Sequence, residues 1–184
     1  MKIVYIKTIG TVRKTIAENL AKSLQSVLPF RFRVIADSGY PLFAFEPKRN
    51  QYYAKKIIEK LACDIPSDCE KLICLTDVDL CTPVLTFVYG EAQLGGSIAL
   101  VSLNRLRQEF YYLPPNDTLL IERVTKECIH ELGHCYGLYH CSNPQCVMCF
   151  SSSVLSIDNK QKKFCVRCGQ YFKKTVRKEN HASE

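Results

Sequence analysis

Short apolar runs alternate with helix-like apolar spacing along the first 75 residues of the chain. The runs read as buried strands, and the stretches between them repeat apolar residues every three or four positions, as an amphipathic helix does. The predicted order is strand 3–6, helix 11–28, strand 31–35, helix from about 50 to 61, and strand 71–75. This order predicts a mostly parallel sheet with right-handed crossovers.

Three local signals set boundaries in this half. Pro29 ends the first predicted helix, because proline cannot continue one. Residues 37–41, Asp-Ser-Gly-Tyr-Pro, predict a turn. Asn50 precedes the second helical pattern and is predicted to cap its N-terminus.

The pattern changes after residue 80. Residues 84–89 and 98–101 are strand-like, and Gly90, Gly95 and Gly96 lie between them with no room for a helix. One strand of the pair is therefore expected to run antiparallel to the others, at an edge of the sheet. Such an edge can bind an extended peptide through main-chain hydrogen bonds, and an ordinary edge hairpin fits the pattern equally well.

A long helix is predicted from about residue 118 to 136, after the stop and N-cap signal Pro-Pro-Asn-Asp at 114–117. His130 lies about 200° of helical rotation from Cys128, so a polar face points away from the core. Cys128 and Cys135 read as small buried residues. The predicted apolar stripe consists of Leu120, Val124, Cys128, Leu132 and Cys135.

The same predicted helix carries a group of candidate metal-binding and catalytic residues. His130 and His134 are four residues apart and share one helical face, where one ion can take both imidazoles. Gly137 can adopt φ > 0 and end the helix, so that the returning chain brings His140 as a third ligand. Glu131 is placed to reach a water rather than the ion. Three neutral nitrogens with one open position is the coordination of a catalytic zinc, and the extended spacing HExxHxxGxxH is the metzincin signature.

Composition and termini bound the class of protein. The chain has 184 residues, 47% of them hydrophobic, which suffices for one core and predicts one domain. It contains no run of about 18 apolar residues that could span a membrane. The apolar residues 3–6 form too short a run for a secretory signal, so a cytoplasmic protein is predicted. The eleven cysteines then read as thiols and metal ligands rather than disulfides.

The net charge of +7 is concentrated at the C-terminal end. Residues 158–184 hold eight Lys or Arg and three Asp or Glu. A solvated basic helix is favoured over a nucleic-acid surface for this segment, because charge runs are commonly only solvated faces.

Five cysteines follow the histidine motif, and two sets of four compete as a second metal site. Zinc-ribbon spacing selects Cys146, Cys149, Cys165 and Cys168, and the other set replaces Cys149 by Cys141. Either set is a closed all-sulfur site with no position left for substrate, so it predicts a structural zinc. Such a site would hold the C-terminal helix to the loop beneath the histidines.

The last third of the chain resembles the archaemetzincins. Their pattern is HExxHxxGxxH followed at once by Cys, then Cys-x-Met, then CxxC, and here it reads His140-Cys141, Cys146-Val147-Met148, and Cys165 with Cys168. The resemblance implies a zinc peptidase of metzincin fold with Met148 in a turn under the histidines. It also implies that Cys149, beside Met148, is diverted and that Cys141 is the structural ligand. Some metzincins have a Tyr two residues after this Met, where the present chain has Phe150.

Together these patterns and the resemblance predict an α+β fold, α/β-like in its N-terminal part, with a twisted mixed sheet, an antiparallel edge strand and an active-site helix. The resemblance implies a Met-turn and a C-terminal helix after it. The domain 1–184 is expected to have an upper part, about 1–137, and a lower part, about 138–184. We expect two zinc ions per chain, Glu131 as general base, a peptide or protein substrate, and a monomer. The alternative is a non-catalytic zinc module that binds peptide or nucleic acid.

Overall fold

A computed structural model describes residues 3–35, 39–63 and 65–181, with side chains to residue 179. Its centre is a five-stranded sheet in the order β2-β1-β5-β8-β7. The first four of these strands are parallel, and β7 pairs antiparallel with β8 at the edge. The bounds are β1 Ile3–Ile9, β2 Arg31–Ile35, β5 Cys69–Thr76, β7 Gly90–Ala92 and β8 Ile98–Ser102. The mixed sheet with an antiparallel edge, and the α+β class, were predicted and are confirmed.

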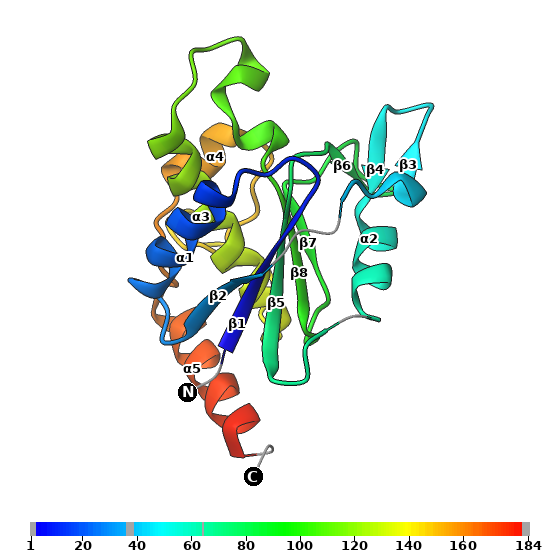
Figure 1. Ribbon diagram of the computed structural model, residues 1–184. Coiled ribbons are helices and arrows are strands. Elements are labelled where there is room, and N and C mark those ends of the chain that lie inside the picture. Colours follow the sequence, from blue (N-terminus) through cyan, green and yellow to red (C-terminus); the bar gives the residue numbers. More distant parts are fainter. Residues whose placement is uncertain (1–2, 36–38, 64, 182–184) are drawn as a thin grey trace.

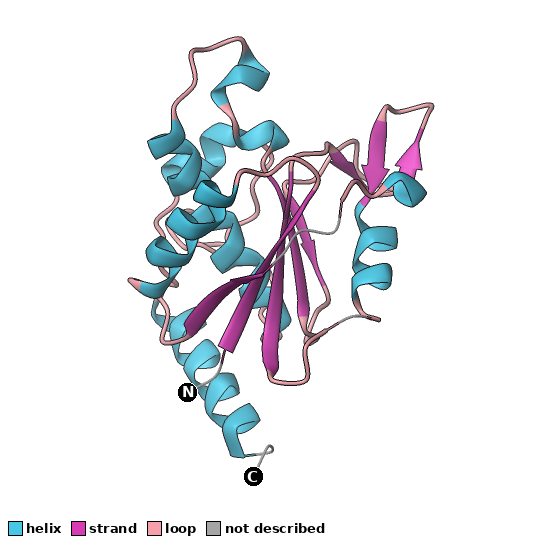
Figure 2. Cartoon of the chain, in the orientation of Figure 1, coloured by secondary structure: helices cyan, strands magenta, loops and turns pink. Residues whose placement is uncertain are grey.

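A second, small sheet stands beside the end of the main one (Figures 1 and 2). It has three short strands in the order β3-β4-β6, which the sequence pattern did not reveal. Strands of two or three residues carry too little alternation to be recognised. Their bounds are β3 Phe45–Glu46, β4 Gln51–Tyr53 and β6 Leu80–Cys81, and the 3₁₀ turn η1 Leu42–Ala44 precedes them.

Helices cover both faces of the main sheet (Figure 1). Helices α1 (Lys14–Gln25) and α3 (Asp117–Cys135) pack on one face, and α2 (Ala54–Leu61) packs on the other. Along β8 the buried side chains alternate between the two cores, with Ala99 in the first and Leu100 in the second. Central strands with two buried faces therefore read as unbroken apolar runs.

Helix α3 has clear signals at both ends. The Asn116 side chain accepts a hydrogen bond from the Leu119 N–H at 2.9 Å, as an N-cap does. At the other end Gly137 has φ +79°, its N–H donates to the His134 carbonyl, and the Leu138 N–H donates to the Gly133 carbonyl. These two bonds form a Schellman motif that reverses the chain. The predicted helix stop at Gly137 is confirmed.

The last part of the chain packs under α3. It comprises α4, Val154–Asn159, and α5, Val166–His181, which extends away from the sheet at the lower end of the molecule (Figure 1). The 3₁₀ turns η2 Asn104–Leu106 and η3 Gln108–Tyr111 connect β8 with α3. Among the described helices, none is both long and apolar enough to cross a bilayer.

Two predicted elements are wrong and one lies partly outside the described residues. Asn50 has φ +51° and ends a turn, and the cap position of α2 is Tyr53, because the strand β4 intervenes. Residues 84–89 form a loop with one isolated bridge between Val88 and Leu80, and the edge strand starts only at Gly90. The predicted turn at 37–41 includes residues 37 and 38, whose structure is not described.

Candidate metal centre and catalytic cleft

Three histidine rings meet at the C-terminal end of α3. The ring centroids of His130 and His134 are 4.7 Å apart, and His140 lies 5.3 Å from the first and 5.0 Å from the second. One nitrogen of each ring lies within 4.8 Å of the other two, so the three can share one ion. The helix spacing provides two of these rings, and the chain reversal at Gly137 delivers the third.

The hydrogen bonds of the rings fix which nitrogen is free for a metal. His130 Nδ1 donates to the Val147 carbonyl at 2.8 Å, and His134 Nδ1 donates to the Leu138 carbonyl at 2.7 Å, since a carbonyl can only accept. Both Nε2 atoms are then lone-pair sites, and they face each other at 3.1 Å. Two facing lone pairs repel unless a cation lies between them. The donor set therefore fits a zinc ion with its usual second shell of carbonyl acceptors.

The electrostatic environment keeps these rings neutral. Burial lowers the pKa of His130 well below its usual range, and the Lys160 cation lowers it further. Burial also lowers the pKa values of His134 and His140. Because only a neutral imidazole binds a metal, these shifts favour metal binding at and below neutral pH.

Glu131 lies beside the rings, in the wall of the same cleft. Its side chain is buried, and burial raises its pKa well above the usual range, with the Glu127 carboxylate acting in the same direction and Lys160 opposing. A carboxylate with a raised pKa holds a proton more strongly. A carboxyl group in this position can exchange a proton with a water bound in the cleft.

The edge strand β7 approaches Glu131 closely at Gly90. A Cβ atom on Gly90 would lie 2.6 Å from Glu131 Oε1 and 2.8 Å from the Leu100 carbonyl. No side chain fits there, so glycine lets the strand edge run directly above the carboxylate. The sequence showed Gly90 only as a break between strands, and a functional role could have been suspected from its place before the edge strand.

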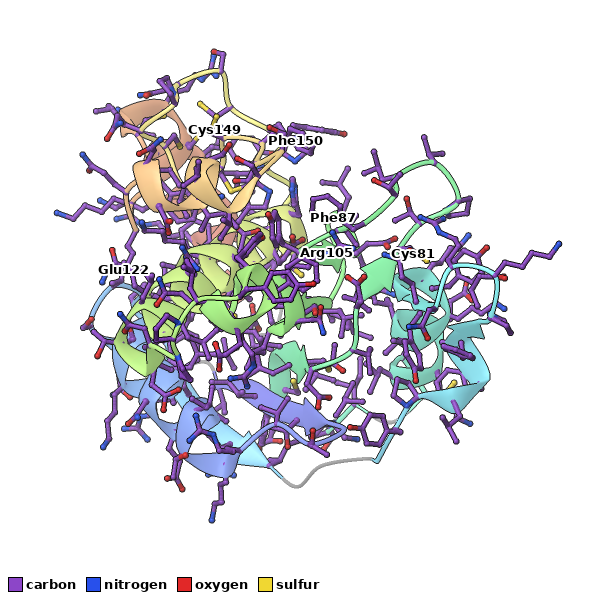
Figure 3. The ribbon with its side chains drawn as sticks, turned by 90° about the horizontal axis from the view of Figure 1, so that it is seen from above. Cys81, Phe87, Arg105, Glu122, Cys149 and Phe150 are labelled. Carbon is purple, nitrogen blue, oxygen red and sulfur yellow. The ribbon has the colours of Figure 1, made fainter. Side chains whose placement is uncertain are left out.

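The cleft has a volume of about 620 Å³. Its upper side is formed by the 82–89 loop and β7, and its lower side by Tyr139, His140 and residues 150–152. Figure 3 shows Phe150 on the segment that faces Phe87. Phe150 packs edge-on against His140, with ring centroids 5.2 Å apart.

Met148 lies under the helix between the two helical histidines. It is fully buried, and Gly133 leaves the space that its Sδ fills, since a Cβ on Gly133 would collide with it. The Cys141 N–H donates to the Met148 carbonyl at 2.9 Å, which joins the turn to the segment after His140. The role of Met148 in a turn under the histidines, which the resemblance implies, stays a prediction.

A second donor cluster lies below, built from cysteines. The sulfur atoms of Cys141, Cys146, Cys165 and Cys168 lie within 4.8 Å of one another, and within the described residues Cys149 is not part of this group. The Cys165 N–H donates to Cys146 Sγ at 3.2 Å, and the Asn143 N–H donates to Cys141 Sγ at 3.5 Å. Burial alone raises the pKa of the Cys141 thiol, but hydrogen bonds with the Asn143 N–H and with the side chains of Cys168, Arg167 and Cys165 outweigh it and lower the pKa to about 7. Four gathered thiols, one already acidic, fit a structural zinc.

A charged pair that was not predicted from the sequence lies behind the histidines. Lys160 Nζ lies 2.8 Å from Glu127 Oε1, and both side chains are buried. Lys160 also donates to the Cys149 carbonyl at 3.4 Å, so it links α3 to the Met148 turn. Glu127 could have been found from its position, one helical turn before Glu131, whereas nothing in the sequence pairs it with Lys160.

Comparison with known proteins gives a consistent result. The model of peptidase family M54 matches residues 9–174. Curated relatives named archaemetzincin include one from Methanocaldococcus jannaschii, 39% identical over 89% of this chain and 88% of the relative, and one from Pyrococcus furiosus, 38% identical over 90% of both.

Solved structures agree with these matches. A zinc-dependent peptidase from Methanocorpusculum labreanum superposes with a TM-score of 0.85 at 32% identity, over 92% of this chain and 99% of that one. An archaemetzincin from Archaeoglobus fulgidus, in complex with malonate, superposes with a TM-score of 0.80 at 34% identity over the same shares.

Proposed function

The chain belongs to peptidase family M54, the archaemetzincins, and is a zinc metallopeptidase by that membership; we propose that it hydrolyses peptide bonds at the histidine cluster, with Glu131 as general base. The observation that carries this proposal is the pair of Nε2 lone pairs facing each other at 3.1 Å beside a buried carboxylate. In this proposal His130, His134 and His140 hold the catalytic zinc. Zinc bound there would polarise the scissile carbonyl and lower the pKa of the attacking water.

The chain's own groups supply the proton transfers and the substrate position. Glu131 accepts the proton of the attacking water on its carboxylate and delivers it to the leaving amine. The raised pKa of Glu131 favours the first of these steps, because the proton is held firmly once transferred. The exposed edge of β7 binds the substrate main chain as an added strand. Gly90 keeps that strand close enough to Glu131 for both interactions to occur together.

The cysteine cluster has a structural role in this proposal. Cys141, Cys146, Cys165 and Cys168 hold a second zinc, which gives two per chain, and no position is open to substrate. Cys141 precedes the Met148 turn, and Cys165 and Cys168 start α5. A metal shared between them ties the floor of the cleft to the C-terminal helix.

We place the protein in the cytoplasm, as a monomer acting on peptides. All eleven cysteines lie in the described part of the chain and are free of disulfides. Free thiols in this number fit a reducing compartment. Size-exclusion chromatography with light scattering measures the oligomeric state.

The test of the catalytic proposal is replacement of Glu131. We expect Glu131→Gln to lower kcat/KM on peptide substrates by about 10²- to 10⁴-fold while the zinc content stays the same, because the ligands remain. Glu122→Gln is the matched control: Glu122 lies on the same helix, its side chain is 46% exposed, and it forms a salt bridge with Lys126. Turnover of the Glu131→Gln variant at the wild-type rate would remove Glu131 from the mechanism.

A further inference from the structure

Both rims of the catalytic cleft carry apolar side chains that face solvent. Leu85 and Leu94 project from the upper side, and Tyr139 and Phe150, 73% and 52% exposed, project from the lower side. Contiguous exposed apolar surface is uncommon on a monomeric protein and marks a binding site. The apolar character therefore belongs to the face that receives the substrate.

A second hollow continues the cleft beyond Phe87. It has a volume of about 450 Å³ and shares Phe87, Tyr89 and Ser152 with the catalytic cleft. Figure 3 shows Phe87 and Arg105 together, across from the segment that carries Phe150. Its further lining includes four partly exposed residues with large apolar side chains or rings, Phe110, Tyr111, Leu113 and Leu155, and also Gln108 and Ser153.

Arginine and glutamate side chains that line the two hollows form ion pairs within the protein. Arg105 binds both carboxylate oxygens of Asp79 at 2.7 and 2.8 Å, and Arg105 also stacks over the rings of Phe87 and Phe110. Two further lining charges are paired in the same way: Arg123 binds Asp158 and Glu127 binds Lys160.

The remaining carboxylates in the walls are those of Glu131, the proposed base, and Glu91. The other charged side chains in the walls are paired within the protein, so the two hollows offer mainly apolar contacts to a substrate.

The upper rim is held in place by a single guanidinium. Arg49 donates to the carbonyls of Thr82, Leu85 and Thr86 at 2.8, 2.7 and 2.8 Å. Two of these bonds, to Leu85 and Thr86, occupy carbonyls within residues 84–89, which form a loop instead of the predicted strand. A fixed apolar rim loses little conformational entropy when it binds a ligand.

We propose that the two joined hollows select extended, unfolded polypeptide segments that carry large apolar side chains. One such side chain occupies the cleft next to the histidines, and a second one, further along the segment, occupies the hollow between Phe110 and Leu155. The proposal rests on the proposed peptidase function and adds its substrate class. Continuity with the catalytic cleft identifies the occupant, because Phe87 and Tyr89 line both hollows and directly precede β7, so a segment that lies along β7 and continues past Gly90 reaches the second hollow.

A binding experiment tests this without turnover. The zinc-loaded Glu131→Gln variant is titrated against fluorescein-labelled decapeptides that carry Leu or Phe at alternate positions, and against the same peptides with Ser in their place. Fluorescence anisotropy gives the dissociation constants. We expect binding of the apolar peptides to be at least about tenfold tighter. Equal affinity for both sets would overturn the proposal.

Variants of the second hollow locate the contact. In the same background, Leu155→Ser is expected to weaken binding of the apolar decapeptide about five- to tenfold and to leave an apolar tetrapeptide, too short for both hollows, unchanged. Leu42→Ser is the matched control, because Leu42 is 70% exposed, Leu155 is 67% exposed, and Leu42 lines neither hollow. If Leu155→Ser lowers the melting temperature, the decapeptide affinity of Leu113→Ser is measured instead. Equal effects of the 155 and 42 variants on decapeptide affinity would contradict the proposed contact.

Two further outcomes separate this inference from its rivals. Tight, apolar-selective binding with no cleavage by the wild-type protein keeps the substrate class and removes the peptidase proposal, whereas cleavage without apolar preference does the reverse. If the exposed rims instead join two copies of the chain, light scattering will show a dimer that Leu155→Ser dissociates, with decapeptide affinity unchanged. That result would overturn the inference.

Discussion

The two donor clusters of this protein lie close together in the sequence and differ in what surrounds them. The histidine cluster opens into a cleft of about 620 Å³, and His140 faces solvent. The cysteine cluster is enclosed, with three of its four side chains buried. The histidines are oriented by backbone carbonyls that accept from Nδ1, and the cysteines by backbone N–H groups that donate to sulfur.

This difference suggests that the two clusters have separate roles, one in hydrolysis and one in the stability of the fold. An open site with a vacant position can admit substrate, and a closed site with four ligands can only hold the chain together. This contrast predicts that the cysteine cluster controls folding and that the histidine cluster controls activity. Variants and conditions that affect one cluster alone test that division.

The largest effect, on the melting temperature, is expected from replacing a cysteine of the cysteine cluster. Cys165→Ser removes one of four ligands from a metal coupled to folding, and we expect the melting temperature to fall by about 10 °C or more. Differential scanning fluorimetry measures it, with zinc per chain determined in parallel. Cys149→Ser is the control, because Cys149 lies outside the cluster, and it should change the melting temperature by no more than about 2 °C. Equal shifts for the two variants would mean that the cluster is not a structural site.

Stepwise metal removal is expected to separate the two clusters. A mild chelator should take the ion from the open histidine site first and abolish hydrolysis, while most of the thermal stability remains. The second ion should leave only under stronger chelation, and the melting temperature should then drop sharply. Activity, zinc content and melting temperature are followed along one chelator titration. Simultaneous loss of all three would contradict independent sites.

A smaller effect, on activity at the histidine cluster alone, is expected from Gly90→Ala. The added Cβ would meet Glu131 Oε1 at 2.6 Å, so the carboxylate or the edge strand must shift. We expect kcat/KM to fall about ten- to a hundredfold, with both zinc ions retained and the sulfur site unchanged. Steady-state kinetics with zinc analysis checks this. Wild-type activity would show that the close approach of β7 to Glu131 is not required.

The smallest effect is expected from mild acid. Protons compete with the metal for imidazole only when the pH falls through the pKa of the ligands, and burial lowers the pKa values of His130, His134 and His140 from 6.5. The histidine-site zinc should therefore stay bound from pH 8 to about 6.5 and be lost only below that range. Zinc content after buffer exchange at each pH measures this. A midpoint of loss above pH 7 would contradict neutral, low-pKa ligands.

Local signals in the sequence predicted most of the architecture. The strands at 31–35 and 98–101 and the stripe on α3 were found because apolar periodicity and burial coincide there. The family resemblance is confirmed by the match to peptidase family M54. The helix end at Gly137 followed from glycine's access to positive φ.

The errors occur where a distant residue overrides the local pattern. Residues 84–89 look like a strand, yet Arg49, about 35 positions earlier, donates to two of their carbonyls, those of Leu85 and Thr86. Asn50 looks like an N-cap, yet the small sheet extends through Gln51–Tyr53 and delays the helix. The Glu127–Lys160 pair is also a long-range contact. The roles of the site residues and the two-part domain division stay predictions.

The hydrogen bond from His130 to the Val147 carbonyl makes the histidine site depend on a segment that is synthesised after the histidines. The Val147 N–H donates to the Lys163 carbonyl, and Lys163 lies just before the final pair of cysteines. During translation the three histidines leave the ribosome before the segment that orients the first of them. The orientation of His130 is therefore expected to be completed only after the segment around Lys163 has been synthesised.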